Sequence, residues 1–338
     1  MKIALLALPG SMMSAISGLA DMFWLTNQTI MMNPGIATPP TDKNAQFDTV
    51  IVSADGKPVH DAQGKKIDCE ASFGDSTVFD RIIVTGMRLN EHKLPIAPDA
   101  VQEAAVWLQT QYRQGSQIAG ACAGGYVLGD AGLLDGKICT TTWWLFPSFR
   151  QRYPNAKALW GKPLVEQDGI ITTGGPLSWI DLALHIVKTD AGNALAKLAA
   201  DMAVADSQPM SQHIYAPRGF VNTIHPLLIR AEQLIRYDAP AMTVEQLAAA
   251  LTMSTRTLHR KISDLTNETP KAFITRVRIE SACVLLENPK NTIVRVAEQC
   301  GYHEETVFRR AFQQVMGMSP AQFKKWTLAR NAAALSKR

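Results

Sequence analysis

The sequence is poor in cysteine and has no long apolar run, and each absence excludes a class of protein. Its five cysteines include no CxxC pair, so neither a disulfide framework nor a metal site is predicted. No apolar stretch reaches the roughly 20 residues that a membrane helix needs. The apolar start is interrupted by Pro9 and Gly10, which favours a buried strand at residues 3–8 over a signal peptide. We therefore expect a protein of the reducing cytoplasm, with no metal, no cofactor and no membrane contact.

Positive charge is concentrated in the last third of the chain. From Thr223 onward there are 17 Lys and Arg against 10 Asp and Glu, a net charge of +7. The preceding residues hold 17 basic and 20 acidic side chains, a net charge of −3. A polyanionic partner is therefore expected for the C-terminal third alone.

The first 205 residues alternate between strand and helix patterns, which is typical of an α/β domain with a mostly parallel, flavodoxin-like sheet. Strands are predicted at residues 3–8, 49–53, 81–85, 117–121, 138–141, 164–167 and 170–173. Helices are predicted at residues 14–26, 98–114, 124–131, 178–188 and 191–205, with Ser178 and Asp181 as a capping pair. Residues 206–222 contain Pro and Gly and are expected to be a linker.

The remainder of the chain has the pattern of an all-α domain with two helix-turn-helix units. In the first unit Thr243 and Gln246 form a predicted capping box, and Ser254 caps the following helix. In the second, Thr292 is the predicted cap and Gly301 supplies the turn. A long helix at residues 270–287 connects the two units.

The second unit carries a motif of fixed spacing. It comprises Ala297, Gly301-Tyr302, Phe308-x-Arg310-x-Phe312, Gly317-x-Ser319-Pro320 and Phe323. This motif resembles the second half of the AraC/XylS-type DNA-binding domain, here residues 223–330. The resemblance implies a sequence-specific transcriptional regulator, more often an activator that contacts RNA polymerase, bound to a double-stranded DNA operator.

Polar residues at the start of each second helix are the candidates for reading bases, because such helices enter the major groove. In the first unit they are Arg256, Thr257 and Arg260, and in the second His303, Glu304, Thr306 and Arg309. Arg can pair bidentately with guanine. Arg310, which lies within the family motif, is interpreted as structural.

A G-x-C-x-G sequence centred on Cys122 occurs at a predicted strand-to-helix junction. Such a junction is a nucleophile elbow, where a helix N-terminus can lower a thiol pKa. With the following Ala131-Gly132-Leu133-Leu134-Asp135-Gly136, it resembles the PfpI-like, class-I glutamine-amidotransferase-like domain. Enzymes of that fold have a histidine where this chain has Thr142, and a carboxylate near the first helix, where Asp21 occurs. Threonine cannot act as a general base near pH 7, so no catalytic residue is predicted.

A pocket that has lost its base can still bind a ligand at the carboxyl edge of the sheet. The predicted ligand-binding residues are Gly86, Met87, Cys122, Ala123, Thr142 and Trp143, and Trp144 is an aromatic neighbour. The resemblance implies a small-molecule effector of the amino-acid or betaine-type amine class, and a homodimer. The alternatives are a cysteine-dependent hydrolase or deglycase with a DNA-binding tail, and an N-terminal domain that serves only for dimerisation.

Overall fold

The computed structural model describes residues 1–36, 46–206, 209–212, 215 and 225–335. The chain divides into two compact units, Met1–Pro209 and Met210–Arg338. The Pro- and Thr-rich sequence of residues 33–44 predicts a loop. Most of this segment and of the predicted linker at 206–222 lies outside the described residues, so the domain limits stay predictions. No helix of the described segments is long and apolar enough to cross a membrane.

A seven-stranded sheet forms the centre of the first unit, in the order β10-β11-β7-β6-β1-β2-β5. Every neighbouring pair is parallel except β10 and β11, which are antiparallel. The strands are β1 (Lys2–Leu6), β2 (Asp48–Ser53), β5 (Ala71–Ser72), β6 (Arg81–Val84), β7 (Gln117–Ala121), β10 (Leu164–Gln167) and β11 (Ile170–Thr173). Two small sheets pair β3 (Val59–His60) with β4 (Lys66–Ile67), and β8 (Ile138–Cys139) with β9 (Lys157–Ala158).

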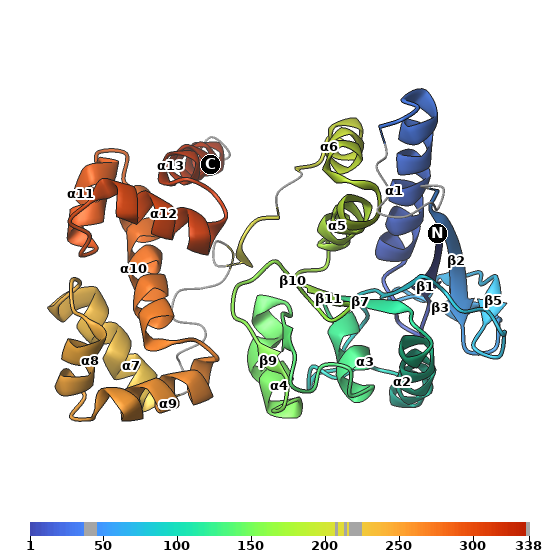
Figure 1. Ribbon diagram of the computed structural model, residues 1–338, viewed down its shortest axis with the longest axis horizontal. Coiled ribbons are helices and arrows are strands. Elements are labelled where there is room, and N and C mark those ends of the chain that lie inside the picture. Colours follow the sequence, from blue (N-terminus) through green and yellow to red (C-terminus); the bar gives the residue numbers. More distant parts are fainter. Residues whose placement is uncertain (37–45, 207–208, 213–214, 216–224, 336–338) are drawn as a thin grey trace. The chain divides into compact units, whose positions relative to one another are not determined.

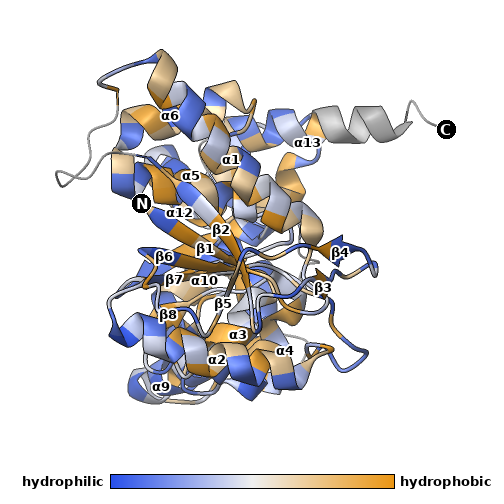
Figure 2. Cartoon of the chain, turned by 90° about the vertical axis from the view of Figure 1, so that its right-hand side faces the viewer, coloured by the Kyte–Doolittle hydropathy of each residue, from blue (hydrophilic) through white to orange (hydrophobic). Residues whose placement is uncertain are grey.

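Helices cover both faces of this sheet, as predicted for alternating strands and helices. The apolar side chains of α1 (Met13–Met32), α5 (Trp179–Ala191) and α6 (Asn193–Met202) share one core with the sheet. The helices α2 (Pro98–Arg113) and α3 (Gly124–Asp130) lie on the opposite face (Figures 1 and 2). The central strands between these layers are mostly hydrophobic, as Figure 2 shows. The short η1 (Trp143–Leu145) and α4 (Phe146–Arg152) follow β8.

Three local predictions in this unit are wrong. The first helix continues to Met32, six residues beyond the predicted end. The Ser178 side chain makes no cap hydrogen bond, so the predicted pairing with Asp181 is absent. The last helix begins at Asn193, because Gly192 has a φ of +94°, a left-handed conformation that separates α5 from α6.

The second unit is entirely helical in its described residues. It consists of α7 (Pro226–Gln233), the π-helical turn η3 (Leu234–Asp238), α8 (Val244–Ala250), α9 (Thr255–Thr266), α10 (Pro270–Leu286), α11 (Ile293–Gln299), α12 (Glu305–Met316) and α13 (Pro320–Leu335). The first half of α10 packs into a core with α7, α8 and α9. Its second half packs into another core with α11, α12 and α13. Thus α10 is the shared axis of two helix-turn-helix units (Figure 1).

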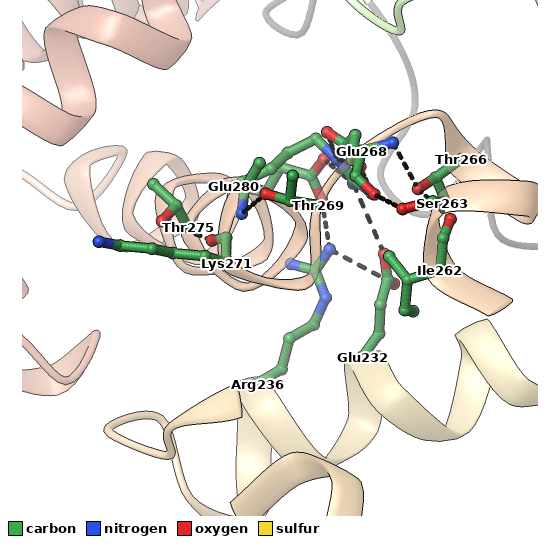
Figure 3. Close-up of polar contacts among 12 residues, drawn as sticks. Glu232, Arg236, Ile262, Ser263, Thr266, Glu268, Thr269, Lys271, Thr275 and Glu280 are labelled. Atoms are coloured by element: carbon green, nitrogen blue, oxygen red, sulfur yellow. Dashed lines mark hydrogen bonds and ion pairs between the residues drawn. The ribbon is translucent and has the colours of Figure 1, made fainter. Parts of the chain in front are cut away.

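A buried ion-pair cluster holds the first of these two cores. Arg276 of α10 binds both Glu268 oxygens from Nε and Nη2 at 3.0 Å, and its Nη1 lies 2.8 Å from Glu280. Arg236 of η3 pairs with Glu280 and lies 3.4 Å from Glu232. Figure 3 shows Glu232 and Arg236 pointing toward Glu268 and Glu280. The cluster therefore ties α7 and η3 to α10 and to the loop before it.

Aromatic rings hold the second core instead. Tyr302, Phe308, Phe312 and Phe323 form a chain of edge contacts, with successive ring centroids 5.4, 5.7 and 5.6 Å apart. Gly301 precedes this chain with a φ of +78°. A Cβ at Gly301 would lie 2.4 Å from the Pro240 carbonyl oxygen. Only glycine therefore fits at this point, where the second helix-turn-helix unit meets the loop before α8.

Candidate DNA-binding surface and effector site

The first helix-turn-helix unit begins with the predicted capping box. Gln246 accepts a hydrogen bond from the Thr243 backbone N–H at 2.8 Å, and Thr243 Oγ1 accepts one from the Gln246 N–H at 3.3 Å. The turn includes Thr252 at a φ of +53°. Ser254 Oγ then caps α9 by accepting from the Thr257 N–H at 3.1 Å. These caps satisfy backbone N–H groups that an exposed helix start otherwise leaves without partners.

The exposed face of α9 is rich in cations. Arg256 and Arg260 are exposed and have no ion-pair partner among the described residues. His259 and Lys261 are exposed beside them. Thr257 is half-buried, and its hydroxyl shares a 2.9 Å hydrogen bond with Ser254 Oγ. The two predicted arginines are therefore available to a partner, whereas Thr257 is partly occupied by the cap.

The corresponding helix of the second unit, α12, presents a different surface. The predicted residues His303, Glu304, Thr306 and Arg309 are all exposed at or near its start. Glu304 is the N-cap residue but makes no side-chain cap bond. Arg309 forms an ion pair with Glu305 one turn earlier. The surface of α12 is therefore less cationic than that of α9.

Two further residues of α12 differ from the sequence interpretation. The helical spacing of Val307, Phe308 and Phe312 predicts that all three share a buried stripe, but Val307 is 49% exposed and lies among the polar residues. Arg310, interpreted as structural, is exposed and has no ion-pair partner among the described residues. Phe308 and Phe312 anchor this part of the helix in the core, and Ala311 packs against it. Both Val307 and Arg310 therefore belong to the surface that α12 offers to a partner.

In the N-terminal α/β unit, Met1–Pro209, Cys122 lies at the predicted elbow between β7 and α3. Its φ of +54° is a left-handed conformation that is strained for a non-glycine residue. The Cys122 N–H donates to the Thr173 carbonyl at 3.1 Å, which fixes the elbow to the end of β11. A Cβ at Gly124 would lie 2.2 Å from the Val84 carbonyl oxygen, so this glycine lets α3 pack directly against β6. This is the backbone geometry of a nucleophile elbow.

The surroundings of Cys122 do not activate its thiol. The residue is only 6% exposed, and burial raises the pKa of the Cys122 thiol to about 12, although a backbone hydrogen bond from Ala123 opposes this. The expected lowering of the thiol pKa by the helix start is therefore wrong, since desolvation dominates. Thr142 is completely buried, and its Oγ1 has no hydrogen-bond partner within the described residues. At pH 7 the thiol is protonated and a poor nucleophile.

Two histidines of the described part of this unit contact carboxylates. His185 is bonded to Glu166 at 2.6 Å, and His92 is exposed beside Glu91. Asp21, the carboxylate that occurs in the predicted first helix, is exposed on α1. The residue that does approach is Met12, which sequence reasoning missed. Its Sδ would lie 3.3 Å from a Cβ on Gly86, and the Cys122 Cβ would lie 3.4 Å from the same point.

The predicted ligand-binding residues come partly together. Gly86 is adjacent to Cys122, and Met87 is buried in a bridge with Ser11 of the loop after β1. Ala123 is buried at the start of α3. Trp143 is half-buried in an edge-to-face contact with Trp144 at 5.5 Å. Of the predicted set, only Trp143 has a substantial surface accessible to solvent.

Together, a nucleophile elbow with a buried thiol and two helix-turn-helix units define a DNA-binding protein with an attached α/β domain. The DJ-1/PfpI family model matches residues 38–189, and a helix-turn-helix domain model matches residues 247–325. The chain belongs to the HTH-type transcriptional regulators in which a DJ-1/PfpI domain precedes an AraC-type DNA-binding domain.

Three similar proteins are named as HTH-type transcriptional regulators. The chain is 26% identical over 277 residues to the HTH-type transcriptional regulator CdhR of Pseudomonas aeruginosa, covering 80% of each chain. It is 24% identical over 272 residues to the regulator GbdR of the same species, covering 80% of this chain and 72% of GbdR. It is also 26% identical over 231 residues to the regulator ArgR of Pseudomonas aeruginosa, covering 67% of this chain and 70% of ArgR.

Among solved structures, a protein from Vibrio parahaemolyticus superposes with a TM-score of 0.50 at 16% identity, covering 60% of this chain and 98% of that one. Drosophila melanogaster DJ-1beta superposes with a TM-score of 0.48 at 19% identity, covering 61% and 98%. At this level of identity the Vibrio structure bears on the fold alone.

Proposed function

We propose that this regulator binds its operator through the exposed faces of α9 and α12 and controls a metabolic operon as an activator. The observation that carries the proposal is the pair Arg256 and Arg260, exposed and without ion-pair partners in the described residues on a doubly capped helix-turn-helix unit. Arginines in the major groove read guanine, and neighbouring cations contact phosphates. His303, Glu304, Thr306 and Arg309 are the corresponding candidates on α12.

The N-terminal domain is proposed to act as the sensor rather than as an enzyme. A buried thiol whose pKa is raised by burial is unsuited to covalent catalysis. We propose that the same elbow binds an amino acid or betaine-type amine, with Gly86, Met87, Cys122, Ala123, Thr142 and Trp143 as its predicted ligand-binding residues. Trp143 and Trp144 supply the aromatic surface that such cations favour. We propose that the regulator acts in the cytoplasm as a homodimer and contacts RNA polymerase.

The first experiment is to incubate the purified full-length protein with fragmented genomic DNA from its source and to sequence the retained fragments. A few sharp peaks upstream of metabolic genes are expected. The variant carrying both Arg256→Ala and Arg260→Ala should lose these peaks, whereas a control with Lys65→Ala, an exposed residue of the first unit, should keep them. Retention spread evenly over the genome would contradict sequence-specific binding.

The sensor role is tested by thermal melting with candidate amines. A ligand that binds only the folded state raises the melting temperature. The shift should be reduced by Trp143→Leu and unchanged by Trp24→Leu, which alters an exposed tryptophan of α1. If both variants respond like the original protein, the elbow is not the effector site.

A further inference from the structure

A cavity of about 360 Å³ lies between α5 and α6, away from Cys122. Leu164 of the edge strand β10 forms one wall, and Pro209 closes another. Its volume is within the range of small-molecule sites, roughly 300–1,000 Å³. Pro209 is the last residue of the first unit, and the chain continues from it toward the DNA-binding unit. The cavity is therefore built from a helix pair and the chain segment that leaves the domain.

The lining of this cavity includes a half-buried carboxylate. Asp181, in the first turn of α5, is half-buried and makes no hydrogen bond or ion pair with the described residues. Burial, with a smaller contribution from Asp206, raises the pKa of Asp181 to about 6. A desolvated carboxylate in a cavity is costly unless a cation approaches it, and such groups are found preferentially at binding sites.

Cations line the same cavity at a distance from Asp181. Lys188 follows Asp181 by two helical turns, about 10 Å along α5. It has no ion-pair partner among the described residues. Lys197 of α6 also lines the cavity, and its Nζ lies 3.9 Å from the Asp201 carboxylate. The cavity therefore has an anionic end and a cationic end.

The wall between these ends is fixed by His185, which lies one turn after Asp181 on the same face of α5. Its Nε2 is 2.6 Å from Glu166 Oε2 of β10, so the imidazole ring and the carboxylate are hydrogen-bonded to each other. Leu184 and Ala196 supply apolar surface in the same lining. This leaves Asp181, Lys188 and Lys197 as the charged groups that can contact a ligand.

We propose that this cavity binds a zwitterion with well-separated charges, such as an ω-amino acid, with its ammonium group at Asp181 and its carboxylate at Lys188 and Lys197. The apolar lining contacts the methylene chain between the two charges. This second site goes beyond the sensor function proposed for the elbow and does not depend on it, because none of its residues is shared with the set around Cys122.

Isothermal titration calorimetry of the full-length protein with 5-aminopentanoate tests the proposal. Pentylamine and pentanoate, which each carry one of the two charges, serve as matched probes. Saturable binding of 5-aminopentanoate is expected, at least tenfold tighter than that of either probe. Asp181→Asn and Lys188→Met should each weaken it at least tenfold. Asp21→Asn, which removes an exposed carboxylate of the same unit, should leave it unchanged.

The proposal is overturned if 5-aminopentanoate does not bind, or if Asp181→Asn and Lys188→Met bind it as the original protein does. Loss of binding in Trp143→Leu alone would also overturn it, because the probe would then occupy the elbow. Circular dichroism melting confirms that each variant is folded. The two single-charge substitutions lie at opposite ends of the cavity, so misfolding of one leaves the other as the test.

The pH dependence provides an independent readout. With a pKa of about 6, Asp181 is mostly ionised at pH 7 and mostly protonated at pH 5, so the affinity should fall about tenfold between them. The other ionisable groups around it are His185 and Lys188 on α5, Lys197 on α6, Glu166 on β10 and Asp206 after α6. The Asp181→Asn variant retains all of these other groups. If its affinity for 5-aminopentanoate still falls between pH 7 and pH 5 as that of the original protein does, the assignment to Asp181 is contradicted.

Discussion

The two helix-turn-helix units have the same topology but are stabilised by different interactions. The first adds an ion-pair cluster to its apolar core, in which the buried Arg276 and the partly buried Arg236 lie among three glutamates. The second is held by the ring chain from Tyr302 to Phe323. Their surfaces differ as well, because the arginines of α9 have no ion-pair partner in the described residues, whereas Arg309 of α12 is paired with Glu305. One topology can therefore be maintained by unrelated chemistry, which leaves each surface free to diverge.

The largest expected effect is on the ion-pair cluster. Arg276→Met removes the central cation and leaves Glu232, Glu268 and Glu280 with Arg236 as the remaining cation of the cluster. Losing one partner of a buried ion pair costs about 3–5 kcal/mol, because a buried charge is left uncompensated. Urea denaturation followed by circular dichroism should show this loss. The control Arg310→Met, at an exposed position, should change stability by no more than about 0.5 kcal/mol. Equal stability of the two variants would contradict a structural role for the cluster.

The next effect concerns DNA affinity. If Arg256 or Arg260 reads a base, its replacement by Ala should cost about 1–3 kcal/mol of operator binding. Arg309→Ala should cost less, because Arg309 exchanges its ion pair with Glu305 for any contact to DNA. Fluorescence anisotropy with a labelled operator fragment at fixed salt measures both. A larger loss for Arg309→Ala would reverse the ranking of the two units.

A smaller effect is expected at the helix starts. Ser254→Ala removes the cap of α9 and should lower the unfolding free energy by about 1 kcal/mol. Glu304→Ala at the corresponding position of α12 removes no side-chain cap bond and should have little effect on stability. Thermal melting of the two variants in parallel provides the comparison, and similar losses would show that the two helix starts are equivalent.

The smallest effect is predicted at the elbow. Cys122→Ala should leave operator affinity unchanged, since the thiol lies in the other unit and is protonated at neutral pH. The same variant provides a check on catalysis. If the original protein turns over an ester or amide substrate and Cys122→Ala does not, the hydrolase alternative gains support.

Much of this molecule could be predicted from local sequence. The capping box at Thr243 and the caps at Ser254 and Thr292 are confirmed, because a cap depends on residues within one turn of the helix start. The strand-to-helix turn at Cys122 is confirmed for the same reason. The pairing of Arg309 with Glu305 could also have been predicted from its i,i+4 spacing.

What the sequence did not predict depends on contacts between distant segments. The raised pKa of Cys122 results from burial among residues such as Met12 and Gly86, which are remote along the chain. The exposure of Val307 depends on which side of α12 meets α10, and helical periodicity alone did not distinguish it from Phe308. The cavity at Asp181 combines β10, α5, α6 and Pro209, so local sequence gives no signal for it.

The shared helix α10 has a consequence for how this regulator can evolve. Its first half belongs to one core and its second half to the other, so adding or removing a residue would rotate one core against the other by about 100°. Such changes are expected to be selected against, whereas the exposed side chains of α9 and α12 can be exchanged one at a time. Operators of related regulators should therefore differ in base sequence within the two DNA segments that α9 and α12 contact. The spacing between these two segments should stay constant.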